Sequence, residues 1–426
     1  MVASKNSNII SKSPTLTLLF GEGTIGNWFF RDALMKGFYA VLLFAFICID
    51  SLAQPIPAAE QLDVFLPLLK GKKVGLVVNQ TSLVKGTHLL DTLLWHKVQV
   101  VRIFGPEHGF RGNADAGEKV NNALDARSGL PVVSLYGKNK KPTSEQIADL
   151  DILIFDIQDV GCRFYTYIST LHYVMEACAE NGKTLIILDR PNPNGMYIDG
   201  PVLDTAYHSF VGIHPVPIVH GMTIGEYAKM INGERWISEQ LSVTSVQLPV
   251  ISKQLYIIPC KNYTHKDSYS LPVKPSPNLP NDLSIALYPS LCLFEGTNVS
   301  VARGTFFPFQ AIGFPDSTYG GTYFVPESIA GMAKEPMYLG KKCYGIDLRS
   351  TKPERRFTLK YVIDFYNQAK DKEAYFNKFF YKLIGNNQVI QQIKECKTEQ
   401  EIRKSWQPAL EKFKLIRKKY LLYPDF

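Results

Sequence analysis

Acidic, amide, guanidinium and aromatic side chains recur in loops that follow short apolar runs of this sequence. Residues 105–112 read GPEHGFRG, residues 156–167 read DIQDVGCRFYTY and residues 189–195 read DRPNPNG. Such loops supply proton donors and acceptors, partners for sugar hydroxyls and rings that can stack on a sugar, and they provide no phosphate cradle. The residue types therefore indicate acid/base chemistry on a hydroxyl-rich ligand.

Three later segments have the same character. They read HGMTIGE (220–226), PSPNLP (275–280) and EGTNVSVARGT (295–305). Their polar side chains are those of Glu226, Asn278, Glu295, Asn298 and Arg303. We expect these segments to close a cleft between the two halves of the chain, because ligand pockets often lie between domains.

The apolar runs that precede the first loops predict buried strands. They are mostly unalternated and β-branched, as strands covered on both faces are, and lie at residues 73–79, 98–104, 132–135, 152–156 and 184–189. Helical patterns fall between them, near residues 89–96, 144–149 and 169–181. Strands that alternate with helices predict an α/β fold with a Rossmann-like, mostly parallel sheet. Ligands bind beyond the carboxyl ends of such strands, where the polar loops lie.

The sequence pattern changes after about residue 240, where the expected loops are longer and richer in proline and aromatic residues. Helical patterns return near residues 359–369 and 398–418. We therefore expect a catalytic domain over residues 55–240 and a smaller C-terminal α+β domain over residues 241–426 that completes the cleft.

We expect residues 1–54 to be a leader that contains a signal peptide. Residues 38–49 are an apolar run that is too short to span a bilayer. Lys36 precedes this run and Ser51-Leu52-Ala53 follows it, the arrangement of a secretory signal peptide. We expect Met35 to be the true start, cleavage after Ala53, a periplasmic or secreted protein, and no stable membrane insertion after cleavage. A GxGxxG at residues 21–26 is interpreted as a chance match, because no βαβ unit surrounds it.

The net charge of +8 is spread along the chain. No basic stripe is interleaved with aromatic residues, so we expect no nucleic-acid partner. No cysteine is spaced as in a metal knuckle or a CxxC motif, so we expect no metal ion.

Many of these segments resemble one family. GPEHGFRG, SLYG, FDIQDVGCRFYTYIST, LDRPNPNG, HGMTIGE, PSPNLP and EGTNVSVARGT are similar to motifs of the exo-β-N-acetylmuramidases, from about residue 70 to the C-terminus. The resemblance implies a Rossmann-like catalytic domain, a smaller C-terminal domain, and release of N-acetylmuramic acid from the non-reducing ends of peptidoglycan fragments without a metal or nucleotide cofactor. Cys162 and Ala302 stand where other small residues are expected.

Glycoside hydrolysis generally needs two carboxyl groups across the scissile bond. Glu107 is the predicted general acid, because it follows a strand end on a glycine-flanked loop; a loop ion pair with Arg111 is the alternative. Asp159 is the predicted second carboxylate, or a turn former. Asp156 ends a buried strand, where it could either titrate abnormally or orient a loop. Glu295 is the strongest candidate among the carboxylates of the second half.

Muramic acid carries a lactyl carboxylate that favours a planar, bidentate cation. Arg163, Arg190 and Arg303 are the candidates, and each could instead hold its own loop in place. Tyr165 and Tyr167 are two positions apart, so in an extended segment their rings point to the same side. They could stack on the sugar or fill the core. The full predicted binding set is Asn79, His108, Arg111, Arg163, Tyr165, Tyr167, Arg190, Asn192, Glu226, Asn278, Asn298 and Arg303.

Two other functions stay open. A nucleotide-dependent oxidoreductase shares the fold class, but NQTS at residues 79–82 stands where a glycine loop is expected; tight nicotinamide binding would favour it. A non-catalytic wall-binding protein gains little from unpaired acids at strand ends; absence of turnover across a panel of muramides would favour it.

Overall fold

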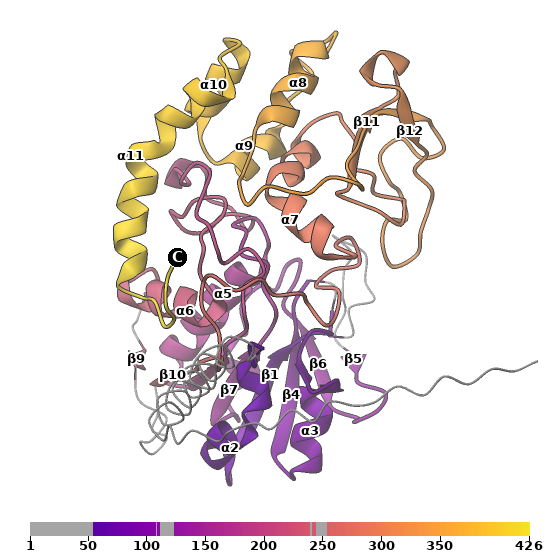
Figure 1. Cartoon of the computed structure of the whole chain (residues 1–426). Helices are drawn as coiled ribbons and strands as arrows, with labels where there is room; N and C mark the ends of the chain where they lie inside the picture. Colours follow the sequence, from indigo (N-terminus) through magenta and orange to yellow (C-terminus); the bar gives the residue numbers. More distant parts are fainter. Residues whose placement is uncertain (1–53, 108, 111–122, 239–240, 244–253) are drawn as a thin grey trace, which may run out of the picture. The chain divides into compact units, whose positions relative to one another are not determined.

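The five predicted apolar runs belong to an eight-stranded sheet in the described part of the structure, which also includes two strands after residue 240 (Figure 1). This computed structural model describes residues 54–107, 109–110, 123–238, 241–243 and 254–426. The strand order is β5–β6–β4–β1–β7–β8–β10–β9. The strands are β1 (Lys73–Val78), β4 (Gln99–Gly105), β5 (Ala123–Leu124), β6 (Pro131–Ser134), β7 (Ile152–Asp156), β8 (Thr184–Leu188), β9 (Ser242–Val243) and β10 (Gln254–Ile258).

The sheet is parallel except at one edge. β6, β4, β1, β7, β8, β10 and β9 pair in parallel, whereas β5 pairs antiparallel with β6. β4 and then β6 lie on one side of β1. The next strands along the chain, β7, β8 and β10, lie in that order on its other side. This is the Rossmann order, and its direction reverses between β1 and β7, where such sheets bind ligands. The predicted Rossmann-like fold is confirmed.

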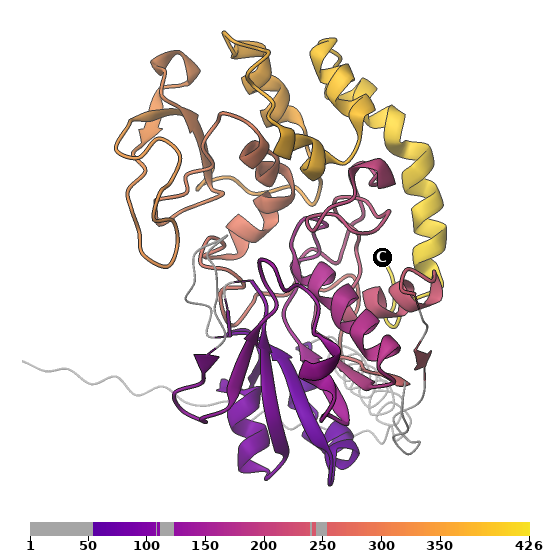
Figure 2. The ribbon, with the colours of Figure 1, turned by 180° about the vertical axis from the view of Figure 1, so that it is seen from behind.

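Different helices cover the two faces of the sheet. Successive strand residues point to opposite faces, so Phe155 packs with α5 (Tyr167–Glu180) and α6 (Ile224–Gly233), whereas Ile154 packs with α3 (Leu89–Trp95). The views from the front and from behind show these two layers (Figures 1 and 2). The shorter elements of this half are η1 (Ala58–Glu60), α2 (Leu62–Phe65), η2 (Leu66–Leu69), β2 (Leu83–Val84), β3 (Thr87–His88), α4 (Ser144–Ile147) and η3 (Thr205–Tyr207).

The second half contains a small sheet and several helices. β11 and β12 each pair antiparallel with β13, which lies between them. The elements are α7 (Asp282–Leu291), η4 (Cys292–Gly296), β11 (Ala311–Phe314), η5 (Ser317–Tyr319), β12 (Thr322–Phe324), β13 (Cys343–Asp347), α8 (Lys360–Gln368), α9 (Lys378–Ile384), α10 (Asn387–Lys394) and α11 (Glu399–Lys418). The helices predicted near residues 359–369 and 398–418 correspond to α8 and α11, and this smaller part is α+β as expected.

The end of the chain returns to the Rossmann-like part. Arg417 in α11 donates two hydrogen bonds to the carbonyl of Gly221, and the Tyr423 hydroxyl donates to Asp189 just beyond β8. Residues 55–426 form one compact unit, and their division into two domains at residue 240 stays a prediction. No helix among the described residues is long and apolar enough to cross a membrane. The predicted leader lies outside the described residues, apart from Gln54.

Candidate active site

A cavity of about 260 Å³ lies beyond the carboxyl ends of β4, β6 and β7 and is closed by the end of α7. Two predicted carboxylates, Glu107 and Glu295, line it together. Of the remaining predicted residues it also gathers four, namely Tyr165, Tyr167, Asn278 and Arg303. The loops after β4, β6 and β7 therefore share one pocket with the segments 275–280 and 295–305, as predicted. The segments 79–82 and 189–195, which follow β1 and β8, and the segment 220–226 were expected there too, but none of their residues, all of which the structure describes, lines this cavity.

Glu107 is held by two residues that the sequence did not single out. The Thr166 hydroxyl donates a hydrogen bond of 2.7 Å to Glu107 Oε2. Burial raises the pKa of Tyr136 above its usual range, and the charge of Glu107 and a hydrogen bond to it add to the rise. Tyr136 follows β6 by two residues, so the rule about strand ends could have found it. Both residues also line the cavity.

Glu295 lies in η4 and forms an ion pair with Arg303 through the guanidinium Nε. The guanidinium carbon of Arg303 also lies 5.2 Å from the centre of the Phe309 ring. Ala302 has a positive φ of 59°, a left-handed conformation that turns the chain just before Arg303. The Cys292 thiol lies 3.7 Å from Glu295 Oε2, within reach of a weak hydrogen bond. This second carboxylate is therefore fixed beside a cation.

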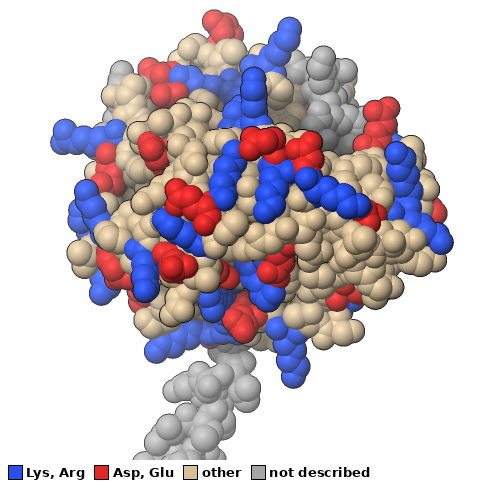
Figure 3. All heavy atoms as spheres, turned by 90° about the horizontal axis from the view of Figure 1, so that it is seen from above, with Lys and Arg blue, Asp and Glu red and all other residues tan. Residues whose placement is uncertain are grey.

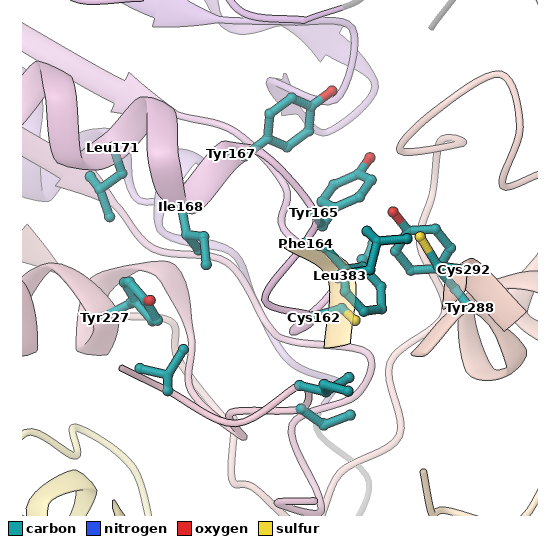
Figure 4. Packing of buried hydrophobic residues seen from close by; sticks show 14 of the residues in the cluster. Cys162, Phe164, Tyr165, Tyr167, Ile168, Leu171, Tyr227, Tyr288, Cys292 and Leu383 are labelled. Atoms are coloured by element: carbon teal, nitrogen blue, oxygen red, sulfur yellow. The ribbon is translucent and has the colours of Figure 1, made fainter. Parts of the chain in front are cut away.

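Tyr165, Tyr167 and Tyr288 line the cavity, and Figure 4 shows their rings near one another. The rings of Tyr165 and Tyr167 meet edge to face with their centres 4.8 Å apart, and Tyr288 meets Tyr165 in the same way at 5.9 Å. Both the Tyr165 and the Tyr167 hydroxyl donate to the carbonyl of Pro275, at 2.8 and 3.4 Å. The rings thus pack against each other and fasten the PSPNLP segment, while still bordering the cavity.

Asn278 brings an unused acceptor to this pocket. Its Nδ2 donates to the carbonyl of Met332 at 2.9 Å, whereas its buried Oδ1 has no hydrogen-bond partner in the structure. A buried acceptor without a partner is costly. A ligand that donates an N–H or O–H group here would remove that cost.

Asp156 and Arg190 do not line the cavity; they form a buried ion pair with each other. Arg190 donates to both oxygens of Asp156, at 2.6 and 2.9 Å, and to the carbonyl of Leu83. Both side chains are almost completely buried. This geometry corresponds to the structural alternative for each residue.

Asp159 is buried below the strand ends and does not line the cavity either. One carboxylate oxygen accepts from the Gly161 N–H at 2.6 Å and lies 3.9 Å from His220 Nε2. Burial raises the pKa of Asp159 to about 7. Burial lowers the pKa of His220 to about 3, with smaller contributions from Arg417 and His265. The two groups therefore tend to be uncharged together near pH 6.

Arg163 is completely buried, and its terminal nitrogens donate to four backbone carbonyls. Two of these carbonyls belong to Leu383 and Ile384 in α9, so Arg163 joins distant parts of the chain. Glu226 is also buried and accepts from His265, from Thr223 in a capping box and from the backbone of Leu422. Neither residue borders the cavity.

The remaining predicted residues have other partners or lie outside the described residues. Asn79 accepts from the backbone and hydroxyl of Thr81, and Asn192 donates to the carbonyl of Met222. Asn298 is half-buried, and its carbonyl accepts from the Tyr338 hydroxyl. His108 and Arg111 lie outside the described residues. No group of three or more His, Cys, Asp or Glu side chains among the described residues could hold a metal ion.

Comparison with known proteins covers nearly the whole described chain. The family descriptions "Exo-beta-N-acetylmuramidase NamZ, N-terminal" and "Exo-beta-N-acetylmuramidase NamZ, C-terminal" match residues 74–283 and 286–423. Peptidoglycan beta-N-acetylmuramidase NamZ of Bacillus subtilis (strain 168) is 38% identical over 390 residues, which are 85% of this chain and 90% of that protein.

Two solved structures of DUF1343 family proteins from Bacteroides fragilis NCTC 9343 are also similar. One is 46% identical with a TM-score of 0.79, covering 88% of this chain and all of the other. The second is 29% identical with a TM-score of 0.70, covering 87% of this chain and 99% of the other. Both parts of the chain are thus matched by the same family. The chain belongs to the exo-beta-N-acetylmuramidase NamZ family.

Proposed function

We propose that this chain is an exo-acting glycosidase that releases N-acetylmuramic acid from the non-reducing ends of peptidoglycan fragments. Its family and its Bacillus relative support this activity. The observation that carries the mechanism is that Glu107 and Glu295 line the same cavity, together with tyrosine rings. Two carboxyl groups around one sugar-sized space are what glycoside hydrolysis needs.

The surroundings of the two carboxyl groups favour different roles. Glu295 forms an ion pair with Arg303, the arrangement of an ionised carboxylate, so it is suited to act as the nucleophile or base. Glu107 accepts from the Thr166 hydroxyl through Oε2, and no cation among the described residues is paired with it. We therefore assign to Glu107 the role of the acid that protonates the leaving oxygen. Pairs of carboxyl groups in unlike environments commonly divide the work in this way.

Recognition of muramic acid is assigned to the same pocket. Arg303 pairs with Glu295 through Nε, which leaves its terminal nitrogens to bind the lactyl carboxylate in a fork. The unpartnered Oδ1 of Asn278 suits the N–H of the acetamido group or a sugar hydroxyl. Tyr165 and Tyr167 border the sugar with their rings.

Turnover of a synthetic aryl β-N-acetylmuramide tests this function. Wild-type protein should release the aryl group, and Glu107→Gln and Glu295→Gln should lose at least about a hundredfold in kcat, as removal of an acid/base group does. Binding of free N-acetylmuramic acid, measured by calorimetry, should persist in Glu107→Gln. No wild-type turnover together with tight muramide binding would instead identify a wall-binding protein.

We further propose that residues 35–53 direct export to the periplasm or the outside of the cell. The support is the basic residue, short apolar run and small-residue cleavage site of that segment. Cell fractionation and N-terminal sequencing of the mature chain test this: we expect a soluble exported chain that begins at Gln54. A cytoplasmic chain that retains residues 35–53 would contradict the proposal.

We propose no nucleic-acid partner. Nucleic-acid-binding proteins gather basic side chains on one face. On the face shown in Figure 3, Lys and Arg side chains are interspersed with Asp and Glu side chains. A filter-binding assay at low salt should therefore detect no saturable binding of duplex DNA or RNA.

A further inference from the structure

A second and larger cavity, of about 560 Å³, lies on another face of α7. Leu283 and Ala286 of this helix line it, whereas Tyr288 at the other end of the helix lines the candidate active site. The two cavities share no lining residue among those that the structure describes. Other walls come from the loop after β13 of the small sheet and from the loops after β8 and β10. These last two loops follow strands of the large sheet, and Rossmann-like folds bind ligands beyond the carboxyl edge of such a sheet.

The cavity has an apolar floor and a charged rim. Met196, Tyr197 and Ile285 contribute to the floor. The rim carries two carboxylates and two cations, all exposed: Asp282, Glu354, Lys352 and Arg355. None of these four charges forms an ion pair within the described part of the chain, and Asp282 accepts a hydrogen bond from Ser270. Charges of both signs are therefore free to meet a ligand.

A further cavity of about 270 Å³ adjoins this one. The two share Ala286 and the segment 351–354, and the second cavity extends past Ser290 to Tyr361 at the start of α8. Together they form a groove along one face of α7, which we call the α7 groove. An elongated ligand would fit such a groove better than a single sugar ring would.

We propose that the α7 groove binds a short peptide that carries both carboxylates and an ammonium group, the chemistry of the stem peptides attached to muramic acid in peptidoglycan. The apolar floor would take the aliphatic parts of the peptide, Lys352 and Arg355 its carboxylates, and Asp282 and Glu354 its ammonium group. A polyphosphate would be repelled by the two rim carboxylates, and a neutral glycan would leave all four charges without partners. The assignment of the peptide to peptidoglycan rests on the proposed function. The shape and charges of the α7 groove do not depend on that function.

Calorimetric titration of the full chain with the free tripeptide L-Ala–D-Glu–meso-diaminopimelate, which contains no sugar, tests the proposal. We expect saturable binding to wild-type protein and at least about tenfold weaker binding to the double variant Lys352→Glu/Arg355→Glu, because charge-assisted hydrogen bonds would be lost. The double variant Lys412→Glu/Lys418→Glu is a matched control, since it reverses two exposed cations on α11. It should bind the peptide as the wild type does.

Ala286→Trp provides a second variant that changes no charge. It fills the groove from α7, and it should also abolish peptide binding while circular dichroism confirms folding. The proposal is overturned if wild-type protein does not bind the peptide, or if both groove variants bind it as wild type does. The proposal is also overturned if wild-type protein binds peptide-free N-acetylmuramic acid and the Lys352→Glu/Arg355→Glu variant does not. The assay needs no turnover, so its result is independent of the glycosidase test.

Discussion

The Thr166 hydroxyl donates a hydrogen bond of 2.7 Å to Glu107 Oε2 instead of capping the helix that Thr166 precedes. A threonine at this position commonly accepts from a backbone N–H of the first helical turn, but here no such cap bond forms. The first turn of α5 is therefore left without that cap, and the hydroxyl is used to orient the candidate acid. Because α5 packs on the sheet, this bond ties Glu107 to the rigid core of the fold.

Thr166→Val should impair catalysis more than folding. The substitution keeps the shape of the side chain and removes the donor, so kcat/KM for an aryl muramide should fall about tenfold to a hundredfold, the effect of a lost hydrogen bond to an ionisable group. Thr166→Ser should restore most of the activity. Thr322→Val, which removes a hydroxyl bonded to the carbonyl of Gly345 in the small sheet, is the control. Equal activity of Thr166→Val and wild type would rule out a positioning role.

Arg303→Lys should weaken recognition of the lactyl group. Lysine keeps the charge beside Glu295 but lacks the planar fork that would hold both Glu295 and a substrate carboxylate. We expect KM for an aryl N-acetylmuramide to rise about tenfold or more, as loss of a bidentate ion pair predicts. The corresponding N-acetylglucosaminide lacks the carboxylate, so its turnover, where measurable, should change less. An equal loss for the two substrates would assign Arg303 to Glu295 alone.

Local sequence was enough to predict five of the eight described strands of the large sheet and part of the pocket, whereas β5, β9 and β10 were missed. β7 and β8 are buried along their whole length, and their unalternated apolar residues indicate this directly. The polar loops after such strands must meet at one edge, which is why Glu107 and Tyr165 were found. Glu295 and Arg303 stand eight residues apart in the chain, so their motif contains both partners.

The residues that the sequence left ambiguous depend on distant partners. Arg163 bonds to carbonyls as far as 221 residues away along the chain, and Asp159 faces His220, which is 61 residues further along the chain. Burial of a charged side chain by such segments cannot be deduced from the residues next to it. Thr166 was missed for the same reason, because its hydroxyl contacts Glu107 from 59 residues away.

Arg163→Met should lower stability strongly. Four buried carbonyls would lose their donor, and each buried acceptor without a partner is costly, so the free energy of unfolding should fall by about 3 to 5 kcal/mol. Urea denaturation measures this change. Arg349→Met is the control: Arg349 is half-exposed and pairs with Asp347, so its removal should cost less than about 1 kcal/mol. A stable Arg163→Met protein with a raised KM would instead support a role in substrate binding.

Asp159→Asn should change how stability depends on pH. The carboxyl group of Asp159 has a pKa of about 7 in the folded protein, against 3.8 ordinarily. Between these values the folded chain keeps a proton that the unfolded chain has released, so this group lowers stability as pH rises. His220, with a pKa of about 3 against 6.5, acts in the opposite direction, and the two effects partly cancel in wild-type protein.

Removing the carboxyl group should uncover the effect of His220. The free energy of unfolding of Asp159→Asn, measured by urea denaturation, should rise between pH 4 and pH 6.5 more steeply than that of wild type. The difference between the two proteins should grow by at least about 1 kcal/mol up to pH 7, since each pKa unit corresponds to about 1.4 kcal/mol, and then level off. Asp63→Asn, which changes an exposed carboxylate, controls for net charge. If Asp159→Asn and wild type differ by the same amount at every pH, Asp159 is ionised throughout this range, and a carboxylate role for it would regain support.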